Sequence, residues 1–163
     1  MNTLIPATSR SHFESVSKLA RDILMPFYLP VIPEDHIDYF LEKFLSVGAL
    51  QTDTGKDFKY WLLQHNGVDA GFLGLQYKPD WLVLSKLYIL EAYRGKGLGR
   101  IAIDLTDEEA KASNYKEIQL GVNEHNNHGI AIYERLGYRK VVLETNSFEN
   151  GHSVNDWLMS KQL

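Results

Sequence analysis

The length, composition and charge of the chain exclude several classes of protein. Of its 163 residues, 44% are apolar and 23% are charged, which is typical of a globular domain and unlike a disordered chain. The formal net charge is −4 and the basic residues are spread along the chain, so no partner with a nucleic-acid backbone or an anionic membrane surface is expected. Cysteine is absent, which excludes disulfides, thiol nucleophiles and cysteine-based zinc sites.

A chain of this length predicts a single domain covering residues 1–163, which would bury roughly 70% of the surface that it exposes when unfolded. Its first residues lack the pattern of a signal peptide, and no apolar run approaches the roughly 18 residues of a membrane span. We therefore expect a cytoplasmic protein.

The first third of the chain predicts a short strand and a long helix. Residues 3–6 are apolar, and Thr8 and Ser9 after them are typical of a helix N-cap. Apolar residues then recur at three- and four-residue spacing, and Pro26 and Pro30 are expected to limit this helix.

A second amphipathic helix is predicted from Pro33, because proline is favoured in the first turn of a helix. Its apolar stripe consists of Ile37, Phe40, Leu41, Phe44 and Leu45. Gly48 stands where a left-handed cap would end this helix.

The pattern then changes to strands. An antiparallel meander is predicted, with strands at residues 58–63, 70–77 and 81–90. The first connection is Asn66-Gly67, a typical hairpin turn, and the second is the turn at residues 78–80. The remaining elements are expected to be a helix from Leu98 to about Ser113, a strand at 118–122, a helix at 127–136 and strands at 138–143 and 154–159, the last two joined by a polar loop at 144–153.

The sharpest local signal is the segment Tyr-Arg-Gly-Lys-Gly-Leu-Gly-Arg at residues 93–100, between a predicted strand and a predicted helix. Its glycines let backbone N–H groups approach a ligand closely, and the helix N-terminus adds unpaired donors and a positive dipole end. Arg94, Lys96 and Arg100 add positive charge. The segment therefore predicts a binding site for a pyrophosphate rather than a mere tight turn.

Two other phosphate-binding motifs are alternatives for this loop. Gly97-x-Gly99-x-x-Ala102 satisfies the dinucleotide fingerprint, but that fold needs parallel units on both sides, and the strands before the loop read as an antiparallel meander. The Gly-x-x-x-x-Gly-Lys-Ser/Thr sequence of P-loop nucleotidases does not occur. The loop is therefore expected to bind pyrophosphate in another fold.

Two motifs together resemble the signature of the GNAT superfamily of acyl-CoA N-acyltransferases. They are Arg94-x-x-Gly97-x-Gly99 and Asn126-x-x-Gly129-x-x-x-Tyr133-x-x-x-Gly137-Tyr138. The resemblance extends over essentially the whole chain, because the order of predicted elements also fits. It implies an α/β (α+β) fold with a mixed, mostly antiparallel sheet of about seven strands, four flanking helices and a splayed cleft between the two central strands.

The resemblance also implies acetyl-CoA as cosubstrate and assigns residues to it. The loop N–H groups would bind the pyrophosphate of coenzyme A, the strand before the loop would pair with pantetheine, and a backbone N–H of that strand would polarise the thioester carbonyl. Asn126 would hold pantetheine. The expected cofactor-binding residues are Leu87, Tyr88, Ile89, Arg94, Gly95, Lys96, Gly97, Leu98, Gly99, Arg100 and Asn126.

The resemblance makes Tyr133 the expected catalytic residue. The acceptor amine would attack the thioester directly, and the Tyr133 hydroxyl would protonate the departing thiolate as general acid. The alternative reading of Tyr133 is an aromatic residue that only packs on the buried face of its helix. The spacing of Tyr133 from Asn126 and Gly137, which matches the motif, favours the catalytic role.

The two motifs do not identify the general base. Many relatives carry a glutamate on the strand before the loop, whereas this chain has Ser85 and Lys86 there, which favours a water-mediated base. Glu124 and His125 are candidates, but each also reads as a solvated loop residue. His125 and His128 have the spacing of a metal pair, but no third ligand is apparent, so no metal is expected.

The acceptor is expected to be the amine of a small molecule. Within the superfamily, the chain is most similar to bacterial polyamine (spermidine/spermine) N-acetyltransferases, through Pro33-Glu34-Asp35-x-Ile37 and the tail Ser147-Phe148-x-x-Gly151-x-x-x-x-Asp156-x-x-Met159. Glu34, Asp35 and Asp38 are the expected substrate-binding residues for such a polycation. Acidic residues also complement the dipole in the first turn of any helix, and that explains Glu34 and Asp35 equally well.

Two further functions stay open as alternatives. One is a non-catalytic acyl-CoA-binding sensor, which the missing strand glutamate favours; the other is an acetyltransferase for peptide N-termini. A nicotinamide oxidoreductase ranks after both. The resemblance also allows a homodimer, because relatives often dimerise through the late strands.

Overall fold

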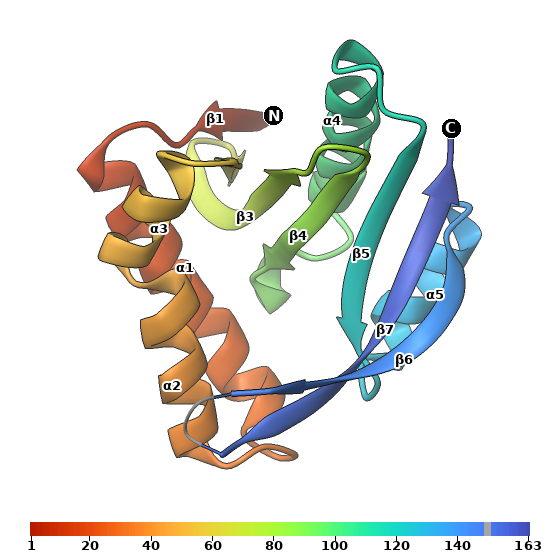
Figure 1. Ribbon diagram of the computed structural model, residues 1–163. Coiled ribbons are helices and arrows are strands. Elements are labelled where there is room, and N and C mark those ends of the chain that lie inside the picture. The colour runs from red at the N-terminus through yellow and green to blue at the C-terminus, as the bar shows by residue number, and fades with distance from the viewer. Residues whose placement is uncertain (149–150) are drawn as a thin grey trace.

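The computed structural model describes residues 1–148 and 151–163, which form one seven-stranded sheet with helices on both faces (Figure 1). The strands are β1 (Asn2–Pro6), β2 (Phe58–His65), β3 (Val68–Tyr77), β4 (Leu82–Ile89), β5 (Glu117–Asn123), β6 (Arg139–Ser147) and β7 (Ser153–Gln162). The helices are α1 (Arg10–Tyr28), α2 (Glu34–Leu45), α3 (Val47–Thr54), the 3-10 helix η1 (Glu91–Tyr93), α4 (Leu98–Ala112) and α5 (Asn127–Arg135).

The strand order is β1-β2-β3-β4-β5-β7-β6, and every neighbouring pair is antiparallel except β4 and β5. This mixed sheet confirms the predicted fold class. No helix in the described part of the chain reaches the length and hydropathy of a bilayer-spanning segment.

Buried side chains alternate between the two faces of the sheet along its strands, and they form two separate hydrophobic cores. In β2, Trp61 and Leu63 point to the face covered by α4 and α5, whereas Tyr60 and Leu62 point to the face covered by α1, α2 and α3. This is the period of two that a strand buried on both faces requires. The sheet is therefore a central layer between two groups of helices.

α1 starts where predicted and ends at Tyr28, between the two prolines, Pro26 and Pro30, that were expected to limit it. Ser9 is the N-cap, and its Oγ accepts from the His12 N–H at 3.2 Å while His12 Nδ1 accepts from the Ser9 N–H at 3.3 Å. Pro26 does not stop the helix, which continues to Tyr28. Packing of the apolar stripe against the sheet therefore outweighs the proline penalty in this last turn.

The prediction of a left-handed cap at Gly48 is wrong. The chain turns at Ser46, whose Oγ accepts from the Ala49 N–H at 3.3 Å and so starts α3, which contains Gly48. Only Leu50 of α3 is buried, so this short helix lacks the apolar period that would have predicted it. It is present in addition to the four predicted helices.

The predicted loop at 144–153 is also largely wrong. β6 continues to Ser147 and β7 begins at Ser153, with Thr145 opposite Asn155 and Asn146 opposite Val154. All of β6 is exposed, so the strand follows from pairing with β7 rather than from an apolar face. Positions 149–150 of the predicted loop lie outside the described residues.

Candidate active site

The two central strands separate along their length. β4 and β5 pair in parallel from Leu82 and Ile118 to Leu84 and Leu120, and within the described residues the pairing goes no further. Ser85 is skipped in the register with β3, because Gly74 faces Lys86 while Leu75 faces Leu84. Such a bulge bends a strand, and the two strands diverge toward their carboxyl ends (Figure 1). This opening, which we call the seam, confirms the predicted splayed cleft.

The seam leaves backbone donors of β4 without a strand partner. The Leu90 N–H donates to the Ala70 carbonyl at 2.8 Å, so alternation in the antiparallel ladder turns the N–H groups of Leu87 and Ile89 away from β3. They point toward the seam, where an extended ligand is able to accept from them. The residues assigned to pantetheine therefore lie along an open strand edge.

The glycine-rich loop follows directly and leads into α4. Gly95 has φ 74° and Gly97 has φ 88°, both in the left-handed region that favours glycine. Gly97 is the N-cap of α4, and no side chain caps this end, so the first N–H groups of the helix are available to an anion. The Asn2 side chain of β1 donates to the Lys96 carbonyl at 2.8 Å and so fastens the loop to the sheet.

The positive charges of the loop lie in solvent around these donors. Arg94, Lys96 and Arg100 are exposed, and Arg100 has Asp104 as its nearest carboxylate at 3.9 Å. The Leu98 side chain is buried in the core, so this residue offers only its backbone to a ligand. Together, the predicted loop residues form a cradle with N–H groups inside and cations at its rim.

Asn126 is held at the start of α5 by its own helix. Its Oδ1 accepts from the Gly129 N–H at 3.0 Å, as an N-cap side chain does. A Cβ on Gly129 would lie 2.6 Å from Asn126 Nδ2, so glycine is needed there for this rotamer. The amide nitrogen of Asn126 remains as the group able to contact a ligand.

Tyr133 lies on the buried face of α5, with its ring 5.8 Å from that of Tyr138 in an edge-to-face contact. Burial raises the pKa of Tyr133 to about 12. Its hydroxyl makes no hydrogen bond to any described residue. The side chain is therefore a protonated donor that is available to a ligand.

Two further tyrosines, Tyr28 and Tyr88, and the carboxylate of Asp156 interact electrostatically in the surroundings of Tyr133. Burial, followed by the charges of Asp156 and Tyr133, raises the pKa of Tyr28 to about 12. Burial, with Tyr28, Tyr133 and Asp156 as further causes, raises the pKa of Tyr88 well above its usual value. These groups come from α1, β4, α5 and β7, so they meet only in the folded chain.

A groove of about 800 Å³ leads from this cluster between the first two helices and the sheet. Aromatic and apolar side chains such as Phe40, Phe44 and Phe148 line it, together with the carboxylates Asp53, Glu144 and Asp156. Burial raises the pKa of Asp156, and the Asn146 amide donates to its Oδ2 at 3.1 Å. The groove thus combines apolar walls with acceptors for a cation.

Lys86 occupies the floor of the same groove. Its side chain is 8% exposed, and burial lowers its pKa to about 8, against the opposing effect of Asp53. The ammonium lies 5.1 Å from the centre of the Phe58 ring and donates to Ser85 Oγ at 3.0 Å. The position where many relatives were expected to carry a glutamate therefore holds a buried cation.

The acidic residues predicted to bind substrate lie elsewhere. Glu34 and Asp35 are exposed in the first turn of α2, and Asp38 pairs with Arg21 at 3.0 Å. None of the three lines the groove within the described residues. The helix-dipole reading of Glu34 and Asp35 fits this placement.

The two candidate bases line a smaller cavity beside the groove, of about 220 Å³. Glu124 Oε1 lies 3.6 Å from His125 Nε2 and accepts from the Asn155 amide at 3.1 Å.

The sequence did not predict that Asp53, Glu144 and Lys86 would lie together in one groove. Asp156 was visible only within the tail motif.

The profile of the Acetyltransferase (GNAT) family matches residues 18–138. The chain belongs to this family.

Relatives of similar sequence are also named N-acetyltransferases. The chain is 30% identical to the uncharacterized N-acetyltransferase YjgM of Escherichia coli over 86 residues, which are 50% of this chain and 52% of YjgM. It thus spans about half the length of that relative. It is 29% identical to the uncharacterized N-acetyltransferase Rv2669 of Mycobacterium tuberculosis over 82% of this chain and 86% of that one.

Solved structures show the same fold. The PaiA N-acetyltransferase of Thermoplasma acidophilum, solved in complex with coenzyme A, has a TM-score of 0.80 at 18% identity and covers 100% of this chain and 99% of its own. The ribosomal-protein-S18-alanine N-acetyltransferase of Escherichia coli has a TM-score of 0.73 at 20% identity, over 99% and 94% of the two chains. At these identities the likeness concerns the fold alone.

Proposed function

We propose that the protein transfers acetyl from acetyl-CoA to a primary amine of a small acceptor, with a polyamine as the favoured acceptor. The observation that carries this proposal is the seam, which leaves N–H groups of β4 without a strand partner just before the uncapped start of α4. The pyrophosphate would bind at residues 95–100 and pantetheine along Leu87–Ile89, with Asn126 on its other side.

The chemistry follows from which groups lie near the thioester. The amine attacks the thioester carbon, the carbonyl oxygen gains charge and accepts from a β4 N–H, and the C–S bond then breaks. The sulfur leaves as thiolate and takes the Tyr133 proton, which a hydroxyl with a pKa near 12 keeps at neutral pH. Asp156 is our candidate to receive the proton of the ammonium, directly or through water, because burial raises its pKa.

The polyamine assignment draws on the charges in the groove. Asp53, Glu144 and Asp156 are spread along it, and aromatic walls between them suit the methylene chains and ammonium groups of a polyamine. Lys78 and Lys86, which also line the groove, are the opposing features, because their positive charges offset those of the carboxylates. A smaller amine or a peptide N-terminus is the second candidate, since one carboxylate at Asp156 suffices for a single ammonium.

The test is release of coenzyme A, followed with a thiol reagent, across spermidine, spermine, monoamines and short peptides. The cysteine-free chain adds no thiol background. Turnover with polyamines and a fall in their kcat/KM of about tenfold or more in Asp156→Asn, which removes both the anionic contact and the proton acceptor, would support the proposal. Asp38→Asn is the matched control, because Asp38 pairs with Arg21 outside the groove.

Two outcomes would count against parts of this proposal. Turnover with peptides alone would remove the polyamine assignment and leave the acetyl transfer. Tight binding of acetyl-CoA without turnover on any amine would instead support the non-catalytic sensor.

A further inference from the structure

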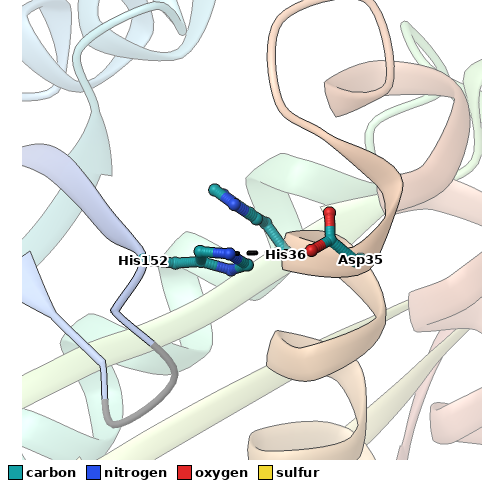
Figure 2. A group of neighbouring side chains, drawn as sticks. All are labelled: Asp35, His36 and His152. Atoms are coloured by element: carbon teal, nitrogen blue, oxygen red, sulfur yellow. Dashed lines mark ion pairs between the residues drawn. The ribbon is translucent and has the colours of Figure 1, made fainter.

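A second cluster of ligand-type side chains lies at the outer end of the groove. Asp35 and His36 are in the first turn of α2, and His152 immediately precedes β7 (Figure 2). One ligand atom from each of the three residues lies within 4.8 Å of the others. Among the described residues this cluster is separate from His125 and His128, the pair with metal-ligand spacing in the sequence.

The three side chains face one another closely. The rings of His36 and His152 are stacked with centroids 2.9 Å apart and planes at 29°. Asp35 Oδ2 lies 3.6 Å from His152 Nε2 on the same side (Figure 2).

Backbone and aromatic contacts of the surrounding chain bring the three side chains together. The Phe148 N–H donates to the His152 carbonyl at 2.7 Å, which closes the end of the β6–β7 hairpin. The Phe148 ring packs against α2, 5.8 Å from Tyr39 and 5.9 Å from Phe44. The hairpin is therefore docked on α2 by aromatic contacts, and His152 is brought to Asp35 and His36 as a consequence.

We propose that Asp35, His36 and His152 bind a divalent transition-metal ion, with Zn²⁺ as the best match. Two imidazoles and one carboxylate are typical zinc ligands, and three protein ligands leave the fourth position of a tetrahedral site open. With metal–ligand bonds of about 2.0–2.1 Å, ligand atoms in such a site lie roughly 3.4 Å apart. The observed ligand atoms all lie within 4.8 Å of one another, and binding an ion would require the stacked rings to turn until their nitrogens point at one centre.

The position of the site gives the ion a defined effect on the groove. His36 lines both the large groove and the smaller cavity beside it. A bound ion would join α2 to the β6–β7 hairpin and place its open coordination position at the outer end of the groove. We therefore expect the ion to stabilise the fold and to alter acceptor binding, while acetyl-CoA binds along the seam as proposed above.

The test uses tag-free, chelator-treated protein without acetyl-CoA. Co²⁺ is titrated while the visible absorption of the ion is recorded, and Zn²⁺ binding is measured by calorimetry. We expect one ion per chain and a melting temperature that rises with Zn²⁺, because the ion binds the folded state. His36→Gln and His152→Gln should each weaken binding by at least about tenfold, since even loss of an outer-shell partner weakens metal sites 10–100-fold.

Three controls make the result decisive. His128→Gln removes an exposed histidine of α5 outside the cluster and should bind like the wild type. Asp35→Asn should weaken binding without removing a histidine. Melting of the metal-free variants at the wild-type temperature would exclude misfolding as the cause. Equal binding by wild type, His36→Gln and His152→Gln, or no binding by any of them, would overturn the proposal.

Discussion

The two sides of the seam are built from different kinds of groups. On the coenzyme A side, the groups able to contact a ligand between Leu87 and Arg100 are mostly backbone N–H groups, nearly consecutive in the chain. On the acceptor side, the groove takes side chains from several helices and strands that are distant in sequence. A backbone site is therefore readable as a local motif, whereas a side-chain site depends on tertiary packing.

The sharpest test of this comparison is Tyr133→Phe, at the point where the two sides meet. We expect kcat to fall by about 10²–10⁴-fold, the usual contribution of a general acid, with acetyl-CoA affinity unchanged. Coenzyme A release and calorimetry measure the two quantities. Tyr115→Phe is the control, because that hydroxyl donates to the Lys78 carbonyl at the far end of β4. Unchanged turnover in Tyr133→Phe would remove the assigned acid.

The next largest effect is expected from Lys86→Met on the acceptor side. Folding lowers the pKa of Lys86 from 10.5 to about 8, so the unfolded chain binds more protons between these values and wild-type stability should rise with pH across that window. Removing the buried charge should raise the free energy of unfolding at pH 7 by about 1–3 kcal/mol and abolish the rise. Urea denaturation at pH 7 and pH 10 measures both.

A matched control for Lys86 is Lys59→Met, whose side chain is 59% exposed. Its stability should change by less than about 0.5 kcal/mol. Equal effects of the two substitutions would contradict a special cost of burying Lys86.

A somewhat smaller effect is expected from Gly97→Ala on the coenzyme A side. The left-handed conformation costs a residue with a Cβ about 1–2 kcal/mol, and relaxation would turn the loop N–H groups away from the anion. We expect about a tenfold loss of coenzyme A affinity by calorimetry. Gly48→Ala, at a helical position with no atom within 4 Å of the added Cβ, should leave affinity unchanged. An unaltered affinity in Gly97→Ala would place the pyrophosphate elsewhere.

The smallest effect is expected from Gly129→Ala. The new methyl group displaces the Asn126 side chain and removes its cap on α5, which is worth about 1 kcal/mol of stability. Thermal melting with and without coenzyme A measures the loss and shows whether Asn126 also contacts the cofactor. A variant as stable as the wild type would show that the side chain finds another cap.

The contrast between local motifs and tertiary packing also explains which parts of the fold could be predicted from the sequence. The meander, its Asn66-Gly67 turn and the helix after Gly97 are each specified by residues close together in sequence, and all were predicted. α3 was missed because only Leu50 of that helix is buried, and the continuation of β6 to Ser147 was missed because that strand has no buried face.

The acceptor groove could not be derived in this way. Asp53, Lys86 and Asp156 belong to three segments that no local pattern connects, and they share the groove only after the helices pack on the sheet. The acidic cluster at Glu34 and Asp35 was visible in the sequence, yet it faces solvent. Neighbouring charges in a sequence are thus a poor guide to which charges share a groove.

The seam also has a mechanical consequence. Backbone pairing between β4 and β5 consists of three residue pairs at one end, so the line from Leu84 to Leu120 acts as a hinge. Rotation of the half formed by β5, β7 and β6 about this line breaks no ladder between β4 and β5. Beyond these pairs, the two halves of the sheet are therefore joined by side-chain packing rather than by backbone hydrogen bonds between β4 and β5.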